Sequence, residues 1–429
     1  MPKYVIIGGS VGGIGATEAI REIDPIGTVA VISEEPFPQY SRPMIADFLC
    51  GEATLERMKY RDDFFWDKNN VQKSTGKKAV SINLNDKYVE LEDGDKVNFE
   101  KLLIATGGKP FLPKIDGLDK DGVSTFVTFS DAERLVAKIT SHKTAVVVGG
   151  GLIGVSAAEA LMKRGVKVTI VEFKDRILNL ILDATAAGIV EEAIKRAGVD
   201  IITGQTVKRI LGRSDSDGIV GGVVLTNDET IPCDLVIMAI GVIPRTELIM
   251  GTDIKVNRGV VVDRFMRTNV PEVYACGDVA EIYDFTIGEN RQLPLFPLAH
   301  ECGKIAGYNM AGKKLEHSGG TAMSALSYFN THIISVGIMN PKDNEGYEVL
   351  VNHDPEKNVY KKVVLRDNVI VGMVFVNDIG RAGIIFYLMK NRVDVNDFKQ
   401  RLLSEDFGLI ALPEKLRKRM LQGSEYGES

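Results

Sequence analysis

The sequence predicts an α/β fold in which two interleaved doubly wound halves precede a small C-terminal α+β domain. A glycine-rich turn that closes an apolar strand and opens a helix-like run occurs twice, at 8–13 and at 149–154. Hairpin-rich stretches interrupt each half, and the glycine turns stop after about Met323. Repeated strand, turn and helix units are typical of a doubly wound parallel sheet, so one chain is expected to hold two such sheets.

The first half opens with a strand over Tyr4–Ile7, a helix over Ile14–Ile23 and a strand over Thr28–Ile32. From Val71 to Phe99 the period changes to short alternating runs broken by Asn-Asp and Asp-Gly, which predicts a small antiparallel excursion. Leu102–Ala105 then returns as a buried strand.

The second half repeats the pattern, with an apolar strand over Thr144–Val148 before its glycine turn. Its other expected elements are the helix 153–163, the strand 166–171, the helix 184–197, hairpins over 207–231 and the strand 235–240. The strand 273–275 and a helix over 298–310, with Pro297 as its first residue, return to the first half. We therefore expect one domain at 1–112 and 245–322, a second at 113–244, and a third at 323–429 that serves as an interface or for dimerisation.

Composition excludes several classes of protein. The net charge of −6 over 429 residues disfavours nucleic acid as a partner. The four cysteines are far apart and show no metal-ligand or dithiol spacing, so neither a metal nor a disulfide framework is expected. No cleavable leader and no apolar run long enough to span a bilayer is present, which predicts a cytoplasmic protein without a membrane span.

Both glycine turns have the spacing that binds a dinucleotide pyrophosphate on a helix N-terminus. In the first turn the three key positions are Gly8, Ser10 and Gly13, so a serine replaces the middle glycine. Glu34 ends the next strand, where an acidic residue accepts the ribose hydroxyls, and Glu35 is its competitor for that role.

The second turn satisfies the rule fully with Gly149, Gly151 and Gly154. Glu172 ends the following strand, 23 residues after Gly149. A carboxylate there accepts both ribose hydroxyls of NADH and repels a 2′-phosphate, so NADH is favoured over NADPH. Lys174 and Arg176, close behind, are the residues that could pair with such a phosphate.

At this point the chain resembles the FAD-dependent pyridine nucleotide-disulfide oxidoreductase superfamily. The marks are both turns, the run from Ser33 to Pro43, Ala105-Thr106-Gly107, the segment 239–244 that contains Gly241, and the segment 274–280 that contains Gly277 and Asp278. The resemblance implies FAD at the first turn, with Arg42 and Pro43 beside the flavin and Asp278 on the ribityl hydroxyls. A helix N-cap is the structural alternative for Asp278.

The resemblance also shows where a thiol is missing. Disulfide reductases of this superfamily place a redox cysteine where this chain has Ser41 and Arg42, and Cys50 is the nearest candidate. A free cysteine is more often a small buried hydrophobe, which is also the favoured interpretation of Cys276 and Cys302. The ferredoxin and rubredoxin reductase branch lacks that thiol, but its usual lysine and glutamate align with Asp47 and Ser156, unless the alignment slips by a residue or two.

The catalytic residues are left open. NADH and a flavin need proximity and orientation more than a general base, and the N-terminus of the helix after Pro297 would stabilise negative charge on the flavin. His300 and Glu301 fall in the first turn of that helix, either as proton relays or, more simply, as polar helix-start residues.

The leading prediction is an FAD-dependent NAD(H) oxidoreductase that exchanges electrons with a small ferredoxin- or rubredoxin-type carrier. The alternatives are an NADH oxidase or coenzyme A-disulfide-type reductase, and a flavoprotein subunit docked on a larger redox complex. A homodimer is one arrangement that the sequence leaves open.

Overall fold

The computed structural model describes residues 2–139, 143–341 and 346–421. By their contacts these divide into two compact units, one formed by 1–173 and 199–320 and the other by 174–198 and 321–429. The three-domain division stays a prediction, but the segment 174–198, which the sequence places inside the second half, groups with the C-terminal part of the chain.

The first sheet of unit one is parallel, with the strand order β19-β7-β1-β2-β3. Its members are β1 (Tyr4–Ile7), β2 (Val29–Ser33), β3 (Val71–Thr75), β7 (Lys101–Ile104) and β19 (Val273–Ala275). The expected antiparallel excursion is confirmed for β4 (Ala79–Asn83), β5 (Tyr88–Leu91) and β6 (Lys96–Asn98). Its predicted start is wrong, because Val71–Thr75 pairs in parallel with β2 as the edge of the main sheet.

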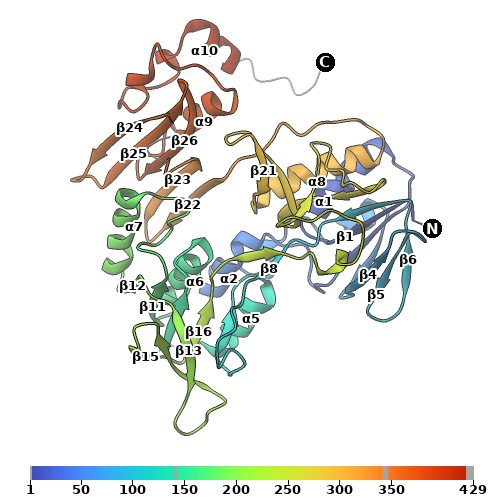
Figure 1. The fold of residues 1–429 in the computed structure, drawn as a ribbon, viewed down its shortest axis with the longest axis horizontal. Helices are drawn as coiled ribbons and strands as arrows, with labels where there is room; N and C mark the ends of the chain where they lie inside the picture. Colours follow the sequence, from blue (N-terminus) through green and yellow to red (C-terminus); the bar gives the residue numbers. More distant parts are fainter. Residues whose placement is uncertain (1, 140–142, 342–345, 422–429) are drawn as a thin grey trace. The chain divides into compact units, whose positions relative to one another are not determined.

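Helices α1 (Val11–Ile23) and α8 (Phe296–Met310) pack side by side on this sheet (Figure 1). Small residues allow the close approach: a Cβ on Gly303 would lie 2.1 Å from the Gly12 carbonyl oxygen, and one on Gly307 2.4 Å from that of Ala16. Pro297 is the second residue of α8 and not its first, so the helix begins one residue earlier than predicted. This packing fixes the N-terminus of α1 directly beyond β1.

The second sheet of unit one is also parallel, in the order β12-β11-β10-β16-β9. Its strands are β9 (Val123–Thr125), β10 (Thr144–Val148), β11 (Lys167–Glu172), β12 (Asp200–Thr203) and β16 (Leu235–Met238), and its helices are α5 (Phe129–Lys138) and α6 (Leu152–Lys163). An antiparallel sheet of β13 (Val207–Gly212), β14 (Val220–Leu225) and β15 (Thr230–Pro232) shares a core of mainly valine, leucine and isoleucine with it. Buried β-branched residues on both faces explain the parallel strands.

Shorter elements complete unit one. The helices are α2 (Ile45–Cys50), α3 (Leu55–Met58) and α4 (Phe65–Lys68). The strands are β8 (Gly108–Pro110), which pairs antiparallel with β17 (Val242–Pro244), and β18 (Val260–Val261), β20 (Ala280–Asp284) and β21 (Glu289–Gln292), which form one small sheet. The β8–β17 ribbon is where the chain leaves the first half and returns to it.

Unit two is an antiparallel sheet in the order β22-β23-β26-β25-β24 with helices around it. The strands are β22 (Met323–Tyr328), β23 (Thr331–Gly337), β24 (Tyr347–Asp354), β25 (Val359–Arg366) and β26 (Val369–Val376), and the helices are α7 (Ala184–Arg196), α9 (Ala382–Lys390) and α10 (Glu414–Leu421). The expected α+β domain is thus observed, with α7 added to it.

Asp183 ties α7 to this sheet. Its carboxylate caps the helix by accepting the Ala186 N–H at 3.0 Å, and it also accepts the Tyr360 hydroxyl at 2.6 Å and the Lys362 ammonium at 2.9 Å. Burial alone would raise the pKa of Asp183, but these three donors together lower it. The charged form is therefore the one that stabilises the unit.

We expect Asp183→Asn to lower the free energy of unfolding near neutral pH by about 2–4 kcal/mol, because Lys362 is left buried without its counter-charge. The folded-state pKa of Asp183 lies below the unfolded value, so this contribution is present above about pH 4 and is lost as pH falls through the folded pKa. Denaturant unfolding from pH 7 to pH 2 measures it. If the parent protein and Asp183→Asn lose the same amount of stability as the pH is lowered, the stabilising role of the Asp183 carboxylate is contradicted.

Candidate functional site

The first glycine turn is shaped by close backbone contacts. Gly8 has φ +122°, and a Cβ on it would lie 2.1 Å from the Ala105 carbonyl oxygen. A Cβ on Gly13 would lie 2.1 Å from the Gly8 oxygen. Ser10 is the N-cap residue of α1, and its hydroxyl caps no N–H group. The helix therefore starts with backbone donors that are open to an anion, and the cradle fits the pyrophosphate of a dinucleotide.

The two acidic residues after β2 have different partners. Glu35 accepts the Tyr40 hydroxyl at 2.8 Å and pairs with Arg42. Glu34 is more exposed and pairs with Arg245 at 2.5 Å. The partners of Glu35 and the greater exposure of Glu34 favour Glu34 as the ribose acceptor, and that role stays a prediction.

Arg42 and Asp278 come from distant parts of the chain, and their charges lie near enough to influence each other. Arg42 begins a short 3-10 turn with Pro43, and its Nη1 donates to the Val127 carbonyl at 3.2 Å. Burial opposes the charge on Arg42, but Glu35 and other anions, including Asp278, raise its pKa. Burial in turn raises the pKa of Asp278, and the Arg42 charge lowers it only partly.

The carboxylate of Asp278 accepts no hydrogen bond from the part of the chain that the structure describes. The N-cap of the turn that holds it, Gly277–Val279, is Cys276, so the helix-capping alternative for Asp278 is wrong. A half-buried carboxylate with free acceptor oxygens fits the hydroxyls of a ribityl chain.

Ala105, Thr106 and Gly107 follow β7 beside the first turn. The Thr106 hydroxyl donates to the Arg245 carbonyl at 3.0 Å, and the Arg245 N–H donates to the Gly107 carbonyl at 3.0 Å. Gly241, at the end of the second sheet, has φ +121°, and its carbonyl accepts the Phe111 N–H at 2.9 Å. These contacts hold together the two segments, around β8 and β17, that connect the first half of the chain to the second.

The second turn repeats the geometry of the first. Gly149 has φ +109°, and a Cβ on Gly154 would lie 1.9 Å from the carbonyl oxygen of Gly149. Gly151 is the N-cap of α6, and no atom lies within 4 Å of a Cβ placed on it. Glu172 is buried at the end of β11 and accepts the Gly150 N–H at 2.6 Å. The turn, the open helix start and the acid together fit a second dinucleotide.

The cysteines lack the environment of a redox thiol. Cys50 ends α2, its thiol donates to the Asp47 carbonyl at 3.3 Å, and burial raises its pKa. Cys276 and Cys302 are both fully buried, and burial raises the pKa of Cys276 to about 12 and that of Cys302 well above its ordinary value. A reactive thiol needs a lowered pKa, so these surroundings favour the packing interpretation of all three cysteines, and a redox role for Cys50 stays a prediction.

We expect Cys50→Ser to keep NADH-dependent flavin reduction and carrier reduction within about twofold of the parent, since the unreactive thiol contributes packing alone. Stopped-flow absorbance and steady-state rates measure both steps. A tenfold or larger loss of carrier reduction, with flavin content unchanged, would show that the thiol does take part.

His300 and Glu301 have partners away from the turn. His300 Nε2 lies 3.0 Å from a Glu18 oxygen, and Arg61 pairs with the other oxygen. Glu301 lies 3.6 Å from Nε2 of the buried His317. These contacts favour the helix-start interpretation, and the proton-relay role stays a prediction.

Asp47 and Ser156 lie on α2 and α6, two helices that pack together. Burial and the nearby Glu52 raise the pKa of Asp47, while Lys163 opposes the shift. These two positions thus hold one carboxyl and one hydroxyl group, and their alignment with the lysine and glutamate of the related branch stays a prediction.

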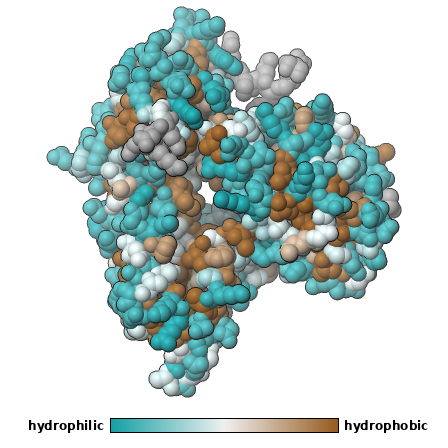
Figure 2. Space-filling model, in the orientation of Figure 1, coloured by the Kyte–Doolittle hydropathy of each residue, from teal (hydrophilic) through white to brown (hydrophobic). Residues whose placement is uncertain are grey.

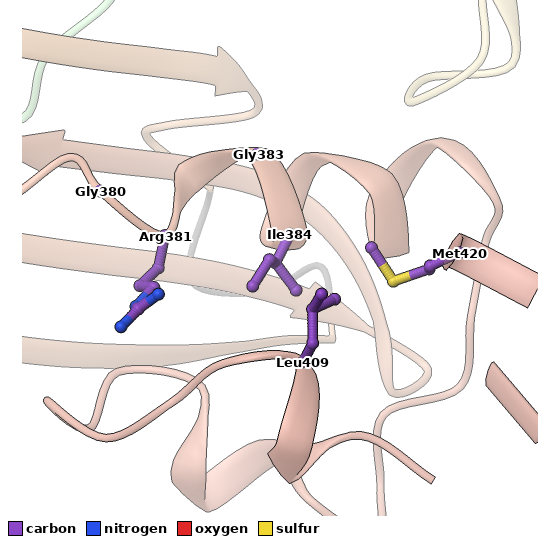
Figure 3. Close-up of a pocket in the computed structure, with 6 residues that line it drawn as sticks. All are labelled: Gly380, Arg381, Gly383, Ile384, Leu409 and Met420. Carbon is purple, nitrogen blue, oxygen red and sulfur yellow. The ribbon is translucent and has the colours of Figure 1, made fainter. Parts of the chain in front are cut away.

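A pocket of about 510 Å³ lies in unit two, lined by Gly380, Arg381, Gly383, Ile384, Leu409 and Met420 (Figure 3). Arg381 is its one charged lining residue, and none of the six belongs to a dinucleotide turn.

In the view of Figure 2 the surface is mostly hydrophilic, with hydrophobic residues in scattered patches.

Within the described ranges, no set of three or more histidine, cysteine, aspartate or glutamate side chains is arranged to hold a metal ion. The helices of those ranges include none with the length and apolar character needed to cross a bilayer.

Two parallel sheets, each with a glycine cradle and an acidic residue at the end of the next strand, define a protein with two dinucleotide sites, which is the arrangement of NAD(H)-dependent flavoprotein oxidoreductases. The chain belongs to the pyridine nucleotide-disulphide oxidoreductase family, whose model matches residues 2–303. The rubredoxin NAD+ reductase C-terminal domain matches residues 323–393.

Some relatives match almost the whole chain. The NADH-dependent phenylglyoxylate dehydrogenase subunit epsilon of Aromatoleum evansii is 31% identical over 94% of this chain and 94% of its own. The Bacillus subtilis nitrite reductase [NAD(P)H] is 29% identical over 92% of this chain, which spans only 48% of that relative. Among solved structures, the NADH:rubredoxin oxidoreductase of Clostridium acetobutylicum has a TM-score of 0.76 at 25% identity and covers 92% of this chain and 97% of its own.

Proposed function

We propose that this protein takes a hydride from NADH at the second turn onto FAD held by the first, and passes the electrons to an iron–sulfur or rubredoxin-type carrier protein. One hydride delivers two electrons, which two one-electron carriers remove in turn. The observation that carries the proposal is the pairing of Arg42 with Glu35, because by the resemblance Ser41 and Arg42 align with the position at which disulfide reductases of this superfamily place a thiol.

The residues would divide the work between the two cofactors. For FAD they are Gly8, Ser10, Gly13, Glu34, Arg42, Pro43, Ala105, Thr106, Gly107, Gly277 and Asp278; for NADH they are Gly149, Gly151, Gly154, Glu172 and Gly241. Bound at the first site, FAD supplies acceptance of a hydride and donation of single electrons. The protein contributes binding, orientation and charge, so no general base is required.

The C-terminal domain supports a protein acceptor. This domain matches the C-terminal domain of rubredoxin reductases. The Clostridium structure, a rubredoxin oxidoreductase, is matched over almost its whole length. A second function is favoured by the Aromatoleum relative, which matches end to end and is named as a subunit of a dehydrogenase. In that case the acceptor or donor is another subunit of a larger redox complex. The cytoplasmic location and the homodimer stay predictions of the sequence.

Anaerobic titration with NADH, followed by separate additions of rubredoxin, ferredoxin, coenzyme A disulfide and oxygen, tests the proposal. We expect flavin bleaching by NADH and fast reoxidation by one of the two carriers. If coenzyme A disulfide or oxygen alone gives fast turnover, that compound is the electron acceptor and the proposed carrier protein is wrong. Copurification of the untagged protein with other subunits in native gel filtration would support the complex instead.

A further inference from the structure

Arg245 connects two edges of the first dinucleotide site. Its backbone is held at the end of β7, because its N–H donates to the Gly107 carbonyl and its own carbonyl accepts the Thr106 hydroxyl, both at 3.0 Å. Its side chain reaches Glu34, directly after β2, with Nη1 2.5 Å from a carboxylate oxygen. These two partners are 211 positions apart in the chain.

The strand order shows what lies between them. β1 sits between β7 and β2, so the ends of β7 and β2 are about 10 Å apart. The end of β1 continues into Gly8 and the start of α1. The Arg245 side chain therefore spans the edge of the sheet at which the glycine turn begins.

This placement brings a guanidinium to a site built for an anion. The start of α1 presents backbone N–H groups and the positive end of the helix dipole. A guanidinium adds a fixed charge and a fork of donors that match phosphate oxygens. The Arg245 side chain is 33% exposed, so it is accessible to a bound molecule.

We infer that Arg245 is a binding residue for the diphosphate and adenosine end of FAD, and that it also orients Glu34 toward the adenosine ribose. The inference rests on the proposed FAD site. It deepens that site by adding a residue from the segment that follows β17, outside both glycine turns. The flavin end, with Arg42 and Asp278, is served by other residues.

The test measures FAD binding to the apoprotein by calorimetry or flavin fluorescence. We expect Arg245→Met to weaken FAD binding by about 10- to 100-fold, as for loss of a charge-assisted hydrogen bond to phosphate. Arg245→Lys keeps the charge and should recover part of the affinity. The difference in FAD affinity between Arg245→Met and the parent should shrink as the salt concentration is raised, because salt screens the charge of the guanidinium.

Arg213→Met is the matched control, since Arg213 pairs with Asp234 at 2.7 Å and belongs to neither glycine turn. NADH affinity of all variants and their thermal unfolding without FAD exclude a general defect. A loss of FAD affinity below tenfold, or an equal loss of NADH affinity, would overturn the role of Arg245. If the parent apoprotein binds no FAD at all, the FAD assignment itself fails rather than this residue.

Discussion

Gly154→Ala is expected to abolish NADH binding and to lower the free energy of unfolding by about 2–4 kcal/mol. The reason is steric, because the new Cβ would lie 1.9 Å from the Gly149 carbonyl oxygen, and both atoms belong to backbone. The turn must open to admit the methyl group, which moves the start of α6 away from β10. Denaturant unfolding and calorimetric titration with NADH measure the two losses.

Gly151→Ala is the matched control, because no atom lies within 4 Å of its Cβ and Gly151 already has a backbone conformation that alanine adopts. We expect its stability to stay within about 1 kcal/mol of the parent, as for a change at an open helix N-cap. NADH affinity should still fall, since the methyl group occupies the approach of the pyrophosphate. If Gly151→Ala binds NADH as the parent does, the pyrophosphate lies elsewhere. If Gly154→Ala is as stable as the parent, the turn is looser than the contact indicates.

Glu172→Gln is expected to weaken NADH binding by about 10- to 100-fold, which corresponds to loss of charge-assisted hydrogen bonds. The amide has nearly the same shape, so the contact with Gly150 is disturbed less than the charge. Removing the negative charge also removes the repulsion of a 2′-phosphate, so NADPH affinity should fall less or rise. Dissociation constants for both nucleotides measure the change in their ratio.

Glu281→Gln controls for the loss of any buried carboxylate. Glu281 is 4% exposed and accepts the Arg258 and Gly259 N–H groups at 2.7 and 2.9 Å, outside both glycine turns. We expect it to lower stability without changing the ratio of NADH to NADPH affinity. An unchanged ratio in Glu172→Gln would remove this residue from nucleotide selection.

Much of the cofactor geometry could be predicted from the sequence because its requirements are local. A turn that lets a helix start close beyond a strand needs glycine at Gly8, Gly13, Gly149 and Gly154. A Cβ added at three of these positions would lie only 1.9–2.1 Å from a backbone oxygen, which explains why. The acid at Glu172 follows within one strand–helix–strand unit. Such signals lie within a few tens of residues, where the order of elements already determines position.

Other features were decided by contacts between distant segments. The alternation of apolar and polar residues did not show that Val71–Thr75 joins the main sheet, because a short strand has the same sequence pattern at the edge of a parallel sheet and in a hairpin. Glu34 and Glu35 are neighbours in sequence, and only Tyr40 and Arg42 separate their roles.

The same holds for residues whose partners are remote in the chain. Asp183 meets Tyr360 and Lys362, and Arg245 meets Glu34, across 177 to 211 positions. The sequence by itself determined the two glycine turns and the acidic residue at the end of β11, because backbone conformation and helix termini act locally. The tertiary structure alone decided which charges meet, because ion pairs between separate elements depend on how those elements pack.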